Sequence, residues 1–291
     1  MTWLNSVVQG LLLGGVYALL ACGLSLMFGV MRIINLAHGD IAVVGAYLVW
    51  VVVDRGGVSP FLAAALVLPV MLVVGYGMQI LLIERSLRAG VLLPLLTTFG
   101  LAIVIQNLLL QLFSPDVHSL GGSAGSVATA SWHVTDTISV SALGALIVAV
   151  AVAVLGGLQL FLSRTTAGRE MRATAQDPDT AQLIGINARA VYARATAIAV
   201  ATAALAGAFV GIRSTFEPSS GPTQLIFAFE AVVIGGFGSL WGTLVGGMVL
   251  GVAQAIGAQI DPRYSVLAGH LVFLAVLASP RGGLLVSRAR A

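Results

Sequence analysis

Polar side chains that could carry chemistry interrupt the long apolar runs of this sequence at two places. The first is residues 29–47, which contain Asn35, His38 and Asp40. One histidine and one carboxylate are too few ligands for a metal ion, so the sequence predicts no metal site there. Capping of a helix that begins near Ile41, with Asp40 at or near its N-cap, is the simpler interpretation.

The second place is residues 228–247, where Glu230 precedes a cluster of glycines by about one and a half helical turns. His270 lies in a later apolar run and is expected to be a packing residue. The apolar runs contain no G-x-S-x-G, no H-E-x-x-H and no close pair of carboxylates. We therefore predict no catalytic site.

Composition indicates a polytopic membrane protein. Hydrophobic residues make up 58% of the 291 residues and charged residues only 9%, against roughly a quarter in soluble domains. The mean hydropathy is +1.03. The formal net charge of +3 indicates no nucleic-acid partner, because the arginines lie in loops rather than in a stripe. None of the 14 basic residues is lysine, so the chain cannot hold ATP through a Walker A loop.

A membrane helix needs about 20 mostly apolar residues. The sequence predicts an all-α protein with about eight or nine membrane segments and a broken or re-entrant, glycine-rich segment near 224–259. The apolar runs are 6–29, 38–53, 60–83, 91–113, 138–162, 191–212, 224–238, 242–259 and 265–279. We expect residues 1–291 to form a single transmembrane domain with a cytoplasmic loop at 163–190.

The distribution of arginine predicts the orientation, because short cytoplasmic loops collect basic residues. Five arginines flank one island between two apolar runs, namely Arg164, Arg169, Arg172, Arg189 and Arg194. No arginine lies between Arg88 and Arg164, and the loop 114–137 carries Asp116 and Asp136 instead. Together with the tail arginines Arg281, Arg288 and Arg290, this pattern predicts an external N-terminus and a cytoplasmic C-terminus.

Helices that break at membrane depth are tolerated only against protein or a wet cavity, because their free amide groups need partners. Glycine-interrupted segments, one in each half of a chain, are typical of a transport pathway. The sequence therefore predicts a translocation path at Glu230, Gly235, Gly236, Gly238, Asn35 and His38. The alternatives are a cytoplasmic turn for the first stretch and a helix pair packed closely through its glycines for the second.

Within the island, D-P-D-T-A-Q-L-I-G-I-N runs from Asp177 to Asn187. Asp177 can cap a helix that Pro178 opens and Gly185 ends, which gives about two turns. Its apolar side is expected to show Ala181, Ile184 and Leu183. Such a helix either anchors at the membrane interface or fits a groove on a cytosolic partner.

Several blocks of residues resemble a known family. Asp179-Thr180-Ala181, followed by three residues and Gly185, resembles the E-A-A-x-x-x-G motif of ABC importer permeases, with Asp in place of Glu and Thr in place of the first Ala. The blocks at 23–40, 168–178 and 235–247 resemble the branched-chain amino acid permeases of the LivH/LivM type, and the first is closer to the LivH-like half. The resemblance covers essentially the whole chain.

The resemblance implies a multi-pass permease of the bacterial plasma (inner) membrane that forms a translocation path for a small amphipathic solute. Branched-chain or other amino acids are the expected solutes, and members of the family also carry urea or short amides. The implied partners are a paralogous LivM-like permease, two cytosolic ATPase subunits and an extracytoplasmic solute-binding protein. ATP and Mg²⁺ would sit on the ATPase subunits, so this chain would need no cofactor of its own.

The resemblance also implies which residues form an ATPase-coupling helix, namely Asp177, Asp179, Thr180, Ala181, Gly185, Ile186 and Asn187, with Arg169 and Arg172 beside them. An ion-coupled secondary carrier for a small solute is the alternative from another class. A carrier needs ion-coupling charged groups deep in the bilayer. Glu230 is the one carboxylate in the sequence that is a candidate for such a group.

Overall fold

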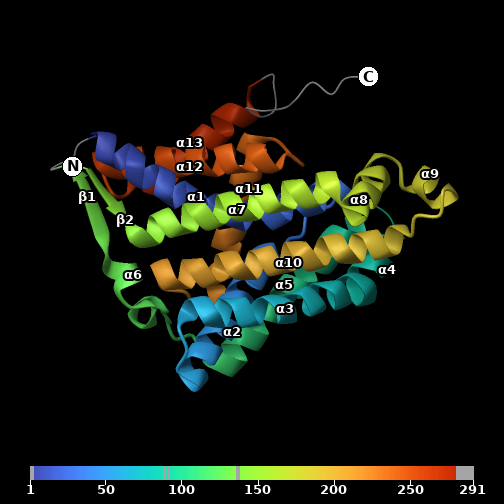
Figure 1. Ribbon diagram of the computed structural model, residues 1–291, viewed down its shortest axis with the longest axis horizontal. Coiled ribbons are helices and arrows are strands. Elements are labelled where there is room, and N and C mark those ends of the chain that lie inside the picture. Colours follow the sequence, from blue (N-terminus) through green and yellow to red (C-terminus); the bar gives the residue numbers. More distant parts are fainter. Residues whose placement is uncertain (1–2, 88–89, 91, 136–137, 280–291) are drawn as a thin grey trace.

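The computed structural model describes residues 3–87, 90, 92–135 and 138–279, and these residues form a bundle of long helices with a small β-hairpin (Figure 1). Among these residues, six helical stretches are long and apolar enough to cross a membrane: α1 (Trp3–Met31), α3 continued by η1 and α4 (Pro60–Leu87), α5 (Leu92–Phe113), α7 (Ala142–Arg164), α10 (Ala188–Arg213) and α12 (Leu240–Ile260). The remaining apolar helices are α2 (His38–Gly56), α11 (Gly221–Gly235) and α13 (Tyr264–Leu277).

Each predicted apolar run therefore corresponds to a helix, but three of these helices are not plain spans. α11 has 15 residues and α13 has 14, fewer than a crossing needs. α2 has 19 residues and carries Asp40, Asp54 and Arg55. The helical, polytopic character is confirmed, whereas the count of eight or nine segments stays a prediction.

Helices α1 and α12 pack against each other through facing glycines. Gly10 and Gly14 of α1 meet Gly251 and Gly247 of α12 so closely that a methyl group on any of the four would overlap the other helix's backbone. Both pairs have the G-x-x-x-G spacing that lets membrane helices approach to backbone contact. α10 is central in the bundle. In its most apolar 18-residue segment 89% of the residues are buried, against 22% in the corresponding segments of α5 and α7.

The chain turns back after α1, so that α2 begins beside the middle of α1. His38 Nε2 lies 2.8 Å from the carbonyl oxygen of Leu20. The non-helical link 32–37 is held within the protein, where Leu36 N donates to Thr98 Oγ1 and Ala37 N donates to Asn35 Oδ1. The link therefore lies against other helices of this chain, and its position relative to the membrane stays a prediction.

A π-helical turn breaks the regularity of one further helix. α3 (Pro60–Met78) passes through a π-helical turn, η1 (Gln79–Ile83), before α4 (Glu84–Leu87). The buried amide oxygen of Gln79 accepts a hydrogen bond of 2.7 Å from the Thr196 hydroxyl of α10. A π-turn inserts one extra residue per turn, which rotates the flanking helical faces relative to each other.

The short elements lie at the two opposite ends of the bundle (Figure 1). At the end that holds the start of α1 are η2 (Gly121–Ala124), α6 (Ser126–Thr129) and the antiparallel hairpin of β1 (Ser131–Thr135) and β2 (Ile138–Ser141); η3 (Pro218–Ser220) leads into α11. At the other end are α8 (Thr166–Gln176) and α9 (Pro178–Leu183). Arg88, Asp136, Arg281, Arg288 and Arg290, on which part of the orientation rests, lie outside the described residues.

Candidate coupling and translocation sites

The helix α9 is fixed by its own local sequence. Asp177 Oδ1 accepts hydrogen bonds from the amides of Asp179, at 3.0 Å, and Thr180, at 3.1 Å. Its other oxygen accepts a hydrogen bond of 2.6 Å from the Thr180 hydroxyl. These bonds, the Thr180 hydroxyl foremost, hold the pKa of Asp177 below its ordinary value. The predicted N-cap at Asp177 and first turn at Pro178 are confirmed.

The other end of α9 closes as predicted, at Gly185. Gly185 has φ +87°, a left-handed conformation that suits glycine. The Ile186 amide donates to the Ala181 carbonyl and the Gly185 amide donates to the Gln182 carbonyl, each at 3.0 Å. This arrangement is a Schellman motif, which satisfies carbonyls that the helix end would leave free.

α9 presents two large apolar side chains to the surroundings. Leu183 is 87% exposed and Ile184 is 72% exposed, whereas Ala181 is buried against the protein. An open groove of about 800 Å³ separates part of α9 from α4 and the start of α10, and Asp179 and Asn187 line it. α9 therefore stands at one end of the molecule (Figure 1), with the side chains of Leu183 and Ile184 uncovered.

The two arginines predicted to act with α9 lie on the preceding helix, α8. Arg169 donates to the Arg164 carbonyl and the Thr166 hydroxyl, so it closes the corner between α7 and α8. Arg172 lines a separate cavity with Gly238. α8 is tied to the bundle by an ion pair of 2.9 Å between Glu170 and Arg194 of α10. Asn187 caps α10 by accepting a hydrogen bond from the Ala190 amide.

Glu230 is buried on α11 and pairs with His270 Nδ1 of α13. One carboxylate oxygen, Oε2, has no hydrogen-bond partner within the described part of the chain. The Tyr17 hydroxyl donates to Gln254 Oε1 at 2.5 Å, and these two residues lie on α1 and α12, both of which pack against α11. His270 is thus the partner of a buried carboxylate rather than a plain packing residue. The sequence could not predict this pair, because the two residues lie 40 positions apart.

The first predicted polar stretch forms a different cluster. His38 and Asn35 are fully buried, and His38 Nδ1 has no partner among the described residues. α2 begins at His38, so Asp40 lies in the first turn and is not the N-cap. Its carboxylate instead accepts a hydrogen bond of 2.9 Å from Gln106 Nε2 of α5. The described residues contain no group of three or more side chains that could hold a metal ion.

The glycines of residues 228–247 are required for two different structural reasons. Gly235 ends α11 against the backbone of Gly242, with no room for a methyl group. Gly236 and Gly238 have φ of +95° and +75°, and the Gly238 turn packs against Gly29 of α1. The predicted break in the helix lies between Gly235 and Leu240. The alternative, in which glycine lets two helices pack closely, also applies at Gly235. Of the six predicted path residues, Gly238 alone lines the cavity with Arg172.

Comparison with known proteins defines the class. The model of the family "Branched-chain amino acid transport system / permease component" matches residues 6–277. The chain therefore belongs to this family of permease subunits of ABC transporters, and it is a multi-pass protein of the inner membrane. The secondary-carrier alternative receives no support.

The relatives extend over almost the whole chain. The permease protein BraD of Pseudomonas aeruginosa, from a high-affinity branched-chain amino acid transport system, is 31% identical over 96% of this chain and 95% of its own length. LivH of Escherichia coli K12 is 30% identical over 96% of this chain and 94% of its own. Among solved structures, PsaBC from Streptococcus pneumoniae in complex with Fab has a TM-score of 0.46 and 16% identity, with 96% and 93% covered. That distant similarity says nothing about the site residues.

Proposed function

We propose that this chain forms one half of the translocation path of an ABC importer and transmits the work of ATP hydrolysis through α9. The observation that carries the proposal is α9 itself, a short helix locked at both ends that exposes Leu183 and Ile184. An exposed apolar tip on a capped helix suits a groove on a partner protein, because helices dock by placing their apolar side chains into hydrophobic grooves.

The partners follow from this arrangement. Two cytosolic ATPase subunits each receive one such helix, one from this chain and one from a LivM-like paralogue. An extracytoplasmic binding protein delivers the solute to the opposite face, near the hairpin of β1 and β2. The chain itself is no enzyme and needs no cofactor, because ATP and Mg²⁺ bind on the ATPase subunits. This orientation puts the N-terminus outside and the C-terminus in the cytoplasm.

Branched-chain amino acids are the proposed solutes, since the relatives named above belong to branched-chain amino acid systems. The proposed path runs past Glu230, a buried residue with one unpartnered carboxylate oxygen, which lies about one and a half turns before the helix break. An ionisable group within a membrane bundle is costly and is therefore a functional candidate by default.

The proposal is tested by changing the end of α9 alone. Gly185→Leu forces a branched side chain into φ +87°, which strains the Schellman motif and tilts the exposed tip. In proteoliposomes with the partner subunits, solute-stimulated ATP hydrolysis and uptake should both fall, while membrane insertion stays normal. Gly57→Leu is the matched control, because Gly57 also has positive φ and open space around it but lies at the end of α2. Unchanged uptake with Gly185→Leu would refute the coupling role of α9.

A further inference from the structure

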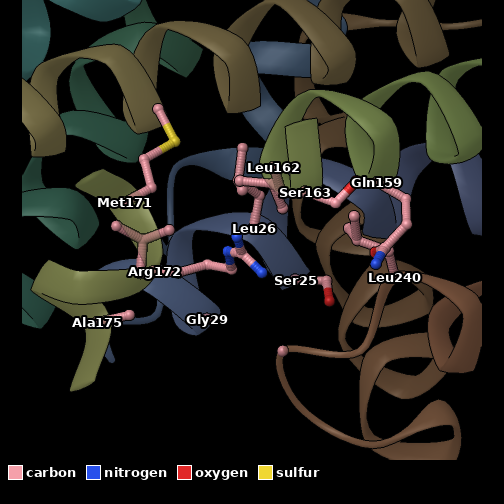
Figure 2. Close-up of a pocket in the computed structure, with 12 residues that line it drawn as sticks. Ser25, Leu26, Gly29, Gln159, Leu162, Ser163, Met171, Arg172, Ala175 and Leu240 are labelled. Carbon is pink, nitrogen blue, oxygen red and sulfur yellow. The ribbon is translucent and has the colours of Figure 1, made fainter. Parts of the chain in front are cut away.

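A cavity of about 230 Å³ lies at the end of the bundle near α8 (Figure 2). α1, α7, α8 and the turn between α11 and α12 form its walls. The cavity is smaller than the roughly 300–1,000 Å³ of sites for drug-sized ligands, so its occupant must be small. All of its lining residues belong to this one chain, and Gly238 is the one predicted path residue among them.

A buried hydroxyl in this wall lacks a partner. Ser25 is 1% exposed, and its Oγ makes no hydrogen bond within the described part of the chain. An unsatisfied buried hydroxyl is unfavourable, and native proteins leave few of them without a protein, water or ligand partner. Ser25 therefore lies in the cavity wall with a hydroxyl that no described residue satisfies.

The cavity also has one uncompensated positive charge. Arg172 is an exposed residue at the mouth of the cavity; it extends its guanidinium from α8 toward Ser25 (Figure 2) and makes no hydrogen bond or ion pair with a described residue. It is the one charged side chain among the described residues that line the cavity. A guanidinium without a carboxylate partner favours an anion with two oxygens, which it can bind in a bidentate manner.

The remaining wall is largely aliphatic, with the amide of Gln159 as a further polar group. Leu26 of α1, Leu162 of α7 and Leu240 of α12 surround the space that Arg172 and Ser25 reach (Figure 2). The cavity thus combines a site for a carboxylate with room for a short branched hydrocarbon chain. The Gln159 amide oxygen can accept a hydrogen bond from an ammonium group on the same molecule.

We propose that this cavity binds a small aliphatic carboxylate from the α8 side of the membrane. The choice of leucine as its natural ligand rests on the function proposed above, which delivers branched-chain amino acids to that side. A bound molecule bridges α8, which leads into α9, to the turn that contains Gly238. Occupancy therefore opposes movement of α9 relative to the bundle and slows ATP hydrolysis when the released solute accumulates.

The test uses the full-length permease in phosphatidylcholine nanodiscs and saturation-transfer NMR. Leucine and 4-methyl-2-oxopentanoate, which share the carboxylate and the chain, should both bind, and leucinamide, which lacks the carboxylate, should not. Arg172→Gln should weaken binding by about ten- to a hundred-fold, because it removes a charge-assisted hydrogen bond. Ser25→Ala should weaken it by about three- to tenfold through one neutral hydrogen bond.

Arg164→Gln is the matched control, since it removes the same charge at the same end of the molecule but Arg164 does not line the cavity. It should bind leucine as the wild type does. Equal binding by the wild type, Arg172→Gln and Ser25→Ala overturns the proposal. Loss of leucine binding when phosphatidylglycerol replaces phosphatidylcholine also overturns it, because the occupant is then an anionic lipid headgroup.

Uptake of leucine by the assembled complex, measured in parallel, separates this inference from the proposed function. If the complex takes up leucine but Arg172→Gln binds leucine as well as the wild type does, the cavity site is overturned and the proposed permease function stands. Binding that depends on Arg172, without leucine uptake, supports the cavity site and overturns the proposed solute. In complexes that transport, leucine on the α8 side should inhibit ATP hydrolysis by the wild type and less by Ser25→Ala.

Discussion

The helix α9 and the turn between α11 and α12 are both short, glycine-dependent features, but different forces shape them. α9 is held by hydrogen bonds between residues no more than five positions apart, from the Asp177 cap to the bond between Ile186 and Ala181. The turn is held by tertiary contacts, in which Gly235 meets Gly242 and Gly238 meets Gly29 of α1. A locally determined element keeps its shape while it moves against a partner, whereas a turn packed into the core moves only with its neighbours.

This difference predicts that replacing a glycine by alanine will destabilise the protein most in the turn. Gly235→Ala places the methyl against the Gly242 backbone, which cannot rotate away, so we expect destabilisation of about 1–3 kcal/mol. Thermal unfolding of the purified protein in detergent measures the change. Gly100→Ala on α5 is the control, because no atom lies near the added methyl and alanine favours a helix by about 0.5–1 kcal/mol. Equal melting temperatures for the two variants would contradict the tertiary origin of the turn.

A smaller effect is expected for the buried carboxylate beside the turn. Glu230→Gln keeps the shape and removes the charge, so a pathway role predicts a change of about tenfold in uptake with the complex still assembled. His270→Gln serves as its partner control, because it breaks the same contact and retains the carboxylate. If the two variants change uptake equally, Glu230 acts through its pairing with His270 and not on the solute.

The smallest effect is expected at the cap of α9. Asp177→Ala removes the hydrogen bonds to Asp179 and Thr180, and coupled ATP hydrolysis should fall by about two- to fivefold as the helix frays. Asp177→Asn should restore most of the activity, since asparagine also caps helices well. Equal activity of the Ala and Asn variants would show that capping by Asp177 does not matter for coupling.

The pH dependence of the cap follows from the lowered pKa of Asp177. A carboxylate whose pKa is depressed in the folded state contributes its stabilisation above its ordinary value, about 3.9, and loses it as the pH falls through the lower value. The difference between the wild type and Asp177→Ala should therefore be the same at about pH 6 and about pH 8. A difference that shrinks over that range would contradict the assignment of the charged carboxylate as the cap.

The same division explains what the sequence could predict. The cap at Asp177, the start at Pro178 and the end at Gly185 depend on neighbouring residues, so they follow from residue types alone. The helical, apolar segments follow from their length and hydropathy. The partners of Glu230 and Asp40, namely His270 and Gln106, lie 40 and 66 residues away, and only packing brings them together. The start of α2 beside Leu20 and the cavity at Arg172 are likewise products of the assembled bundle.

The central claim is that α9 faces the cytoplasm and fits an ATPase subunit, and cysteine labelling tests it directly. In a Cys22→Ala background, which removes the one native cysteine, Leu183→Cys and Ser123→Cys each place a thiol at an exposed position, at opposite ends of the bundle. With a membrane-impermeant reagent, Ser123→Cys should label in intact cells and Leu183→Cys only in opened ones, where added ATPase subunits should block it. Labelling of Leu183→Cys in intact cells, or labelling that the ATPase subunits leave unchanged, would contradict the account.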